Sequence, residues 1–303
     1  MFNLIRMNIY RMIFMKGMRI TLLCTILFAG FAAYMSYTDT KYMQEETEKL
    51  APSGTDKEIA LAGFEDASKE QDTNEADKQE DEADFSFGIY VETPYNEDGS
   101  PADFLQYYAA DLASGTILIF TIIAAALFVA AEEKSGFVKN IAGQARHRGD
   151  IYLAKLPAMA LYILGQMLFY GLVQYIVLRI SFAEPIPFGA SMFKDALIVF
   201  LIDFLLYLAF ASGIMMFTTV FRTNTISITV GMLSAMGASA MLFSFVGRII
   251  DKDVCKYMVT NSIKVNIPGA EQKTIILTVI VGFLYLIVYN GIGTIIFAKR
   301  DVV

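Results

Sequence analysis

Residues 196–217 read ALIVFLIDFLLYLAFASGIMMF, an apolar run in which Asp203 is the only charged residue. A helix of roughly 20 apolar residues is long enough to cross the hydrocarbon core of a bilayer. Five further stretches have the same character: residues 20–37, 112–131, 156–178, 226–246 and 274–298. The sequence therefore predicts an all-α, multi-pass membrane protein with six transmembrane helices.

The composition agrees with this fold class. Hydrophobic residues make up 55% of the chain and charged residues 18%, whereas soluble domains average about 25% charged residues. By count, 21 of the 31 acidic residues lie between positions 39 and 111. The net charge of −7 therefore describes one acidic insert, and no clustered basic face indicates nucleic-acid binding.

Three regions follow from this distribution: residues 1–38 with the first transmembrane helix, the acidic extracellular insert 39–111, and residues 112–303 with transmembrane helices two to six. Within residues 2–19, an apolar face predicts a helix in the membrane interface; the alternative is a simple extension of the first span. In the insert, residues 45–84 are too polar to fold alone. Alternation over residues 85–92 predicts a short strand, and residues 101–111 a short helix.

The distribution of Lys and Arg predicts the orientation of the chain. With the N-terminus inside, the cytoplasmic segments hold twelve basic and four acidic residues, a net of +8, and the outer segments twelve basic and 26 acidic, a net of −14. The outer loop 247–273, with five basic residues, is the exception; we expect it to form short helices. The prediction is that both termini are cytoplasmic.

The rare residues exclude several chemistries. His147 is the single histidine, so no multi-histidine metal site can form. Cys24 and Cys255 are expected at different depths, too far apart for a disulfide. The phosphate-loop pattern G-x-x-x-x-G-K-[ST] is absent from the sequence. We therefore expect no enzyme activity and no cofactor or metal in this chain; energy for transport would come from a partner or an ion gradient.

The segment 132–155 between the second and third spans carries the most specific pattern. An acid ends the span, a glycine follows four residues later, an apolar-Lys-Asn-apolar run comes next, and Arg-x-x-Ile-Tyr-x-x-Lys opens the third span. The residues concerned are Glu132, Gly136, Lys139, Asn140, Arg148, Ile151, Tyr152 and Lys155. The pattern resembles the ABC-2-type exporter permeases, and within them the bacterial permeases for bacitracin, lantibiotics and other antimicrobial or toxic, modulin-like peptides.

This resemblance implies a bacterial plasma-membrane permease for peptide export or self-protection, hence antimicrobial resistance. Such a permease dimerises, usually with a second copy of itself, and binds two separate ATPase subunits that hold ATP and Mg. Segment 132–155 would be the coupling loop, with a plain connector as the alternative. Its candidate ATPase contacts are Glu132, Gly136, Phe137, Lys139, Ile141, Arg146 and Arg148.

Other transport functions stay open from the sequence. Type-2 exporters also move drugs and lipid-linked glycans, and an ion-gradient-driven secondary transporter is a further alternative. Asp203 inside the fourth span is either part of a proton or substrate path or a packed acid bonded to a neighbouring helix. Gln166, Gln174 and Asn290 are expected to form interhelical hydrogen bonds. The small residues of 231–239 predict close packing, at a dimer seam, a substrate groove or within one chain.

Overall fold

The computed structural model describes residues 2–50, 103–134, 147–181, 187–250 and 254–299. In these residues the chain is helical and contains no strand. The elements, in order, are α1 (Phe2–Phe14), α2 (Lys16–Leu50), α4 (Phe104–Ala113), α5 (Thr116–Lys134), α7 (Arg148–Leu153), α8 (Lys155–Ser181), η1 (Ala190–Met192), α9 (Phe193–Phe221), α10 (Asn224–Ala235), α11 (Ala238–Ile250), η2 (Cys255–Tyr257), α12 (Val259–Lys264) and α13 (Gln272–Lys299). The predicted strand at 85–92 lies outside the described residues.

Four helices of the described chain are long and apolar enough to cross a membrane by themselves: Lys16–Thr38, Arg148–Ser181, Phe193–Phe221 and Gln272–Lys299. Two bent helix pairs are long and apolar enough only when each pair is taken together, α4 with α5 bent by 53° and α10 with α11 bent by 63°. Six spans result if each bent pair counts as one. Glycines with positive φ allow both bends, Gly115 at 77° and Gly237 at 100°.

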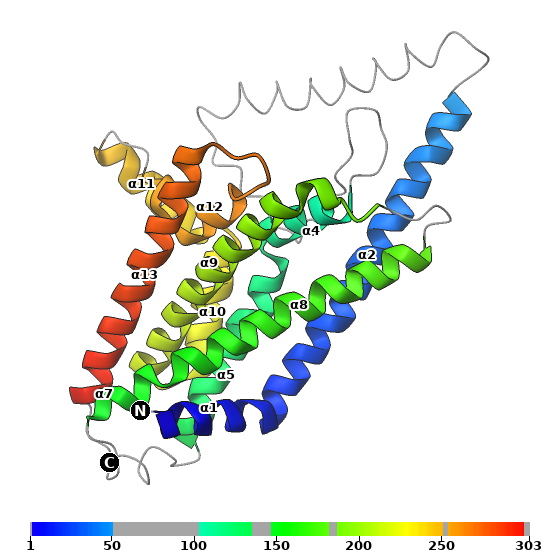
Figure 1. Ribbon diagram of the computed structural model, residues 1–303. Helices are drawn as coiled ribbons and strands as arrows, with labels where there is room; N and C mark the ends of the chain where they lie inside the picture. Colours follow the sequence, from blue (N-terminus) through cyan, green and yellow to red (C-terminus); the bar gives the residue numbers. More distant parts are fainter. Residues whose placement is uncertain (1, 51–102, 135–146, 182–186, 251–253, 300–303) are drawn as a thin grey trace.

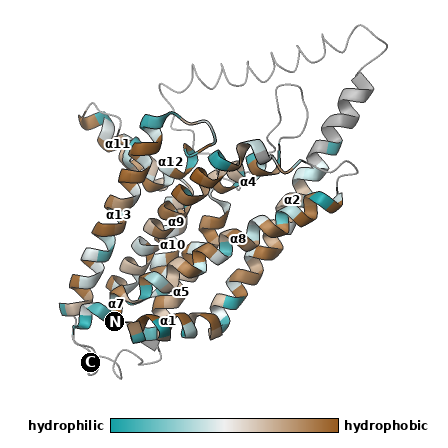
Figure 2. Cartoon of the chain, viewed as in Figure 1, coloured by the Kyte–Doolittle hydropathy of each residue, from teal (hydrophilic) through white to brown (hydrophobic). Residues whose placement is uncertain are grey.

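The centre of the bundle is α9 (Figure 1). Leu206, Tyr207 and Ala211 on this helix have no exposed surface, because α4, α5, α10 and α13 pack around them. The outer helices keep exposed apolar side chains, such as Leu27 on α2 and Ile287 on α13. Figure 2 shows hydrophobic residues along the length of α9 and α13. This pattern, apolar inside and outside, is typical of a membrane bundle.

Both described ends of the chain lie at the same end of the bundle (Figure 1). There, Ile151, Tyr152 and Phe297 form a buried cluster, and Leu4 and Met7 of α1 pack against it. We call this the α1 end, and the end with α4 and α12 the α4 end.

At the foot of the bundle, α1 is separated from α2 by Met15 and turns away from it (Figure 1). The helix is therefore not a straight extension of the first span. Asn8 and Met12 form its buried face, while Phe2 is 78% exposed and Ile13 53% exposed. Exposed apolar side chains of this kind are those that an interfacial helix would place against lipid.

Candidate functional site

A buried cluster of three charges lies at the α1 end. Arg11 of α1 places Nη2 2.5 Å from Oε1 of Glu132, and Nζ of Lys155 binds Oε2 of the same carboxylate. The side chains of Glu132 and Lys155 are each only 1% exposed, and that of Arg11 is 20% exposed. We call these three residues the Glu132 cluster. It joins α1, the end of α5 and the beginning of α8.

Aromatic rings enclose the two cations of the Glu132 cluster. The Arg11 guanidinium lies 4.9 Å from the centroid of the Phe128 ring, and Nζ of Lys155 lies 5.0 Å from that of Phe297. Cations over ring faces are attracted by the ring quadrupole. Since Phe297 belongs to α13, the cluster also connects to the last transmembrane helix.

The Glu132 cluster marks the two ends of the predicted coupling loop. Glu132 stands where the chain leaves α5, and Lys155 where α8 begins, so their ion pair closes segment 132–155. Arg148 lies exposed at the start of α7. Five other predicted contact residues lie outside the described residues: Gly136, Phe137, Lys139, Ile141 and Arg146.

Close packing fixes the return of the loop to the bundle. A Cβ on Gly149 of α7 would lie 2.6 Å from Cγ2 of Thr294, and a Cβ on Gly293 would overlap the ring of Tyr152. The two glycines therefore allow α7 and α13 to approach each other directly. This contact was not predicted from the sequence, although Tyr152 belongs to the quoted motif and Gly293 lies in an apolar run, where a small residue permits close helix packing.

A second polar cluster lies toward the α4 end, around Asp111. Tyr170 Oη and Gln174 Nε2, both on α8, each donate to Oδ2 of Asp111 at 2.5 Å. All three side chains are fully buried. The interhelical role predicted for Gln174 is confirmed. Asp111 was not among the candidate residues, because the sequence placed it at the edge of the acidic extracellular insert.

Asp203 is fully buried in α9. Asn266, which follows α12, donates through Nδ2 to Asp203 Oδ1 at 2.7 Å and to the Val199 carbonyl at 3.1 Å. Oδ2 of Asp203 has no hydrogen-bond partner among the described residues. The acid is thus bonded to the segment between α11 and α13, where η2 and α12 form the short helices expected there.

The remaining intramembrane amides differ in their partners. Gln166 accepts a hydrogen bond from Thr121 and donates one to Thr25, both at 3.1 Å, which links α2, α5 and α8 as predicted. Asn290 donates to Leu286 within its own helix. Its Oδ1 has no hydrogen-bond partner among the described residues, so the interhelical bond predicted for Asn290 is not found there.

Within 231–239, one glycine packs inside the chain. A Cβ on Gly231 would lie 2.6 Å from Ile214 Cδ1 and 2.8 Å from Ile122 Cγ2, so Gly231 allows α10 to pack against α9 and α5. Ser234 and Ser239 bond to each other across the bend at 3.0 Å. They line a cavity of about 340 Å³ that also contacts Tyr289 of α13.

Neither cysteine forms a disulfide in the described chain, Cys24 being exposed and Cys255 half-buried. The described residues contain no group of three or more His, Cys, Asp or Glu side chains that could hold a metal ion.

The described residues form a helical bundle with four to six helices or helix pairs that are long and apolar enough to cross a membrane, as in an all-α membrane protein. The chain belongs to the family described as "Protein of unknown function (DUF2705)", whose model matches residues 74–303. The match includes Asp111, Glu132, Lys155 and Asp203 and leaves Arg11 outside it. No curated protein and no solved structure matches the chain.

Proposed function

We propose that the chain is the permease subunit of an ATP-driven ABC-2-type exporter that moves amphipathic or antimicrobial peptides out of a bacterial cell. One observation carries the proposal: Glu132 and Lys155, both part of the motif that resembles these permeases, form a buried ion pair across the two ends of segment 132–155. A coupling loop needs firm attachment at both ends, because a partner that pushes on it must move the helices behind it.

The contacts of the Glu132 cluster would transmit a movement of segment 132–155 to the helices of the bundle. Breaking a buried ion pair costs about 3–5 kcal/mol, so α5 and α8 are expected to move together at this end. Arg11 connects the same carboxylate to α1, and the tight contact of α7 with α13 connects the loop to the last span. A movement of this one loop would therefore be transmitted to α1, α5, α8 and α13.

The proposal assigns the α1 end to the cytoplasm, where an ATPase has access to ATP. This assignment agrees with the excess of Lys and Arg predicted for the cytoplasmic segments. Since the sequence lacks a phosphate loop, ATP and Mg would be bound by two copies of a separate ATPase subunit. Exposed apolar faces, such as Leu284 and Ile287 of α13, are available to lipid or to a second permease copy.

Copurification tests the proposal. The tagged chain is isolated from membranes of its own host in a mild detergent, and retained proteins are identified by mass spectrometry. The expected result is an ATPase subunit with a phosphate-loop motif and ATP hydrolysis in the purified complex. A chain that retains no ATPase and still transports in its absence would contradict the proposal.

A second candidate, an ion-gradient-driven transporter, gains support from one observation. Asp111 and Asp203 are both fully buried in helices proposed to cross the membrane, and intramembrane acids often mark ion paths. Proteoliposomes that contain only this chain distinguish the two functions. Uptake driven by an imposed proton or sodium gradient, abolished by Asp203→Asn, would favour the secondary transporter.

A further inference from the structure

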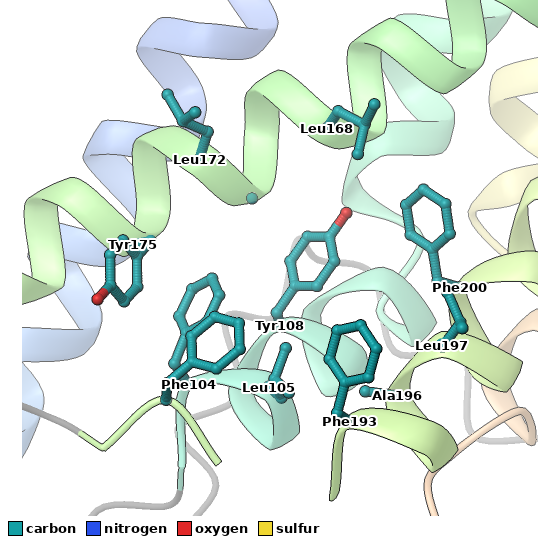
Figure 3. Close-up of a pocket in the computed structure, with 12 residues that line it drawn as sticks. Phe104, Leu105, Tyr108, Leu168, Leu172, Tyr175, Phe193, Ala196, Leu197 and Phe200 are labelled. Carbon is teal, nitrogen blue, oxygen red and sulfur yellow. The ribbon is translucent and has the colours of Figure 1, made fainter. Parts of the chain in front are cut away.

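A cavity of about 350 Å³ lies at the α4 end, between α4, α8 and the beginning of α9 (Figure 3). Aromatic side chains form much of its wall. The Phe104 and Tyr175 rings meet edge to face with centroids 5.0 Å apart, and Phe188 lies within 6.0 Å of both. Because the rings hold one another in place, the cavity is preformed.

The wall of the cavity offers almost nothing to a polar ligand. Among the described residues that line it, none is charged, and the side-chain polar atoms are the hydroxyls of Tyr108 and Tyr175. The Tyr108 hydroxyl already donates to the Met167 carbonyl at 2.9 Å. A charged group placed inside would lose its hydration without compensation. The cavity therefore favours the hydrocarbon part of a ligand over a polar or charged group.

The cavity opens toward lipid. Leu168, Leu172 and Phe193 line it, yet they are 56%, 55% and 52% exposed. Figure 3 shows both leucines on α8, with Tyr108 between that helix and Phe193 at the start of α9. In a helix that crosses the bilayer, exposed leucines face acyl chains. A ligand can therefore enter sideways from the membrane.

Two exposed cations lie close in sequence to residues that line the cavity. Arg179 is one turn beyond Tyr175 on α8 and therefore on the same face, and Lys194 directly follows Phe193. Both residues are exposed. Tyr175 stands six residues before the end of α8, about 9 Å along the helix axis. The phosphate of a lipid whose acyl chain fills the cavity would lie at this end of the bundle, where the two exposed cations are available to it.

We propose that this cavity binds one acyl chain of a bilayer phospholipid, with the lipid phosphate beside Arg179 and Lys194. Asp103 and Asp195 lie at the same end of the bundle, so both charges of a phosphoethanolamine headgroup find a counterpart. The inference goes beyond the proposed exporter function, since it depends only on the membrane location of the chain.

Tryptophan fluorescence can test this proposal, because the sequence contains no tryptophan and a single introduced one is the only source of the signal. Phe200→Trp introduces a single tryptophan at the cavity wall. Phe204→Trp is the matched control: it lies one turn further along α9, is half-buried as Phe200 is, and does not line the cavity. The probe is phosphatidylethanolamine with brominated acyl chains, which quench tryptophan on contact. It is titrated into the intact, delipidated protein in detergent.

Since a pocket buries most of its ligand, we expect the emission of Phe200→Trp to fall by roughly half at about one lipid per protein. The control should be quenched only gradually. Adding Ala196→Phe, which fills the cavity, or Arg179→Gln with Lys194→Gln should shift the titration to higher lipid concentrations. Circular dichroism checks that each variant is folded. Parallel quenching of both tryptophans, or displacement of the lipid by amphipathic peptide at equal concentration, would overturn the proposal.

Discussion

Replacing Lys155 by methionine tests how the Glu132 cluster stabilises the protein. Methionine keeps most of the side-chain volume and removes the charge, so Glu132 is left buried with Arg11 as its cation. Removing one partner of a buried pair costs about 3–5 kcal/mol. Because Arg11 still contacts the carboxylate, we expect the lower end, about 3 kcal/mol.

The double variant Glu132→Gln with Lys155→Met separates charge from packing. It removes the buried carboxylate as well, and Arg11, which is 20% exposed, can take up water. We therefore expect the double variant to recover most of the lost stability, as in other double-mutant cycles of coupled charges. Lys299→Met is the control, because Lys299 is exposed at the same end of the bundle, and its effect should stay within about 0.5 kcal/mol.

Thermal unfolding in detergent, followed by circular dichroism, provides the measurement for all three variants. The expected order of stability is wild type and Lys299→Met first, then the double variant, then Lys155→Met. If Lys155→Met unfolds with the wild type, or if Glu132→Gln brings no recovery, the three charges do not form one buried cluster, and the mechanical link between the loop and α5 is wrong.

Three further changes test other parts of the molecule. Phe137→Asp with Ile141→Asp should leave membrane insertion intact but abolish ATPase copurification and transport. The reason is that charge buried between segment 132–155 and the ATPase subunit costs several kcal/mol. Retained association would show that the coupling assignment is wrong. Gly293→Ala should lower the free energy of unfolding by about 1–3 kcal/mol, because its Cβ would overlap Tyr152 of α7. Gly291→Ala is the control and should leave stability unchanged, because no atom lies within 4 Å of its Cβ. Thermal unfolding measures both variants. Deleting residues 51–84 should preserve the assembled complex in size-exclusion chromatography and alter the transport of cationic substrates; loss of assembly would assign the insert a structural role.

Hydropathy predicted the long apolar helices, four of which could each cross a membrane by themselves, because a chain in lipid must satisfy its backbone hydrogen bonds within helices. The bends of the second and fifth spans were not predicted. Gly115 and Gly237 lie inside or beside apolar runs, and a glycine there is compatible with a straight helix as well as with a break. Only the packing of neighbouring helices decides between the two.

The candidate sites were predicted less completely than the spans. The motif drew attention to Glu132 and Lys155, but the partner Arg11 lies 121 positions before Glu132 in the chain, and helical periodicity carries no information about pairs so far apart. Asp111 ends the short helix predicted at 101–111, but that prediction did not indicate Tyr170 and Gln174 as its partners. The acidic composition of the insert is an average over many residues, whereas the burial of Asp111 depends on the helix that packs against it.

The bond between Asn266 and Asp203 has a consequence for the synthesis of the protein. Asp203 lies in the central helix, yet its amide partner is translated 63 positions later. The nascent α9 therefore enters the membrane with an acid whose final partner does not exist, and α13, which packs against α9, follows later still. An unpartnered acid is costly in hydrocarbon. The innermost helix can thus reach its native environment only after α13 has been translated.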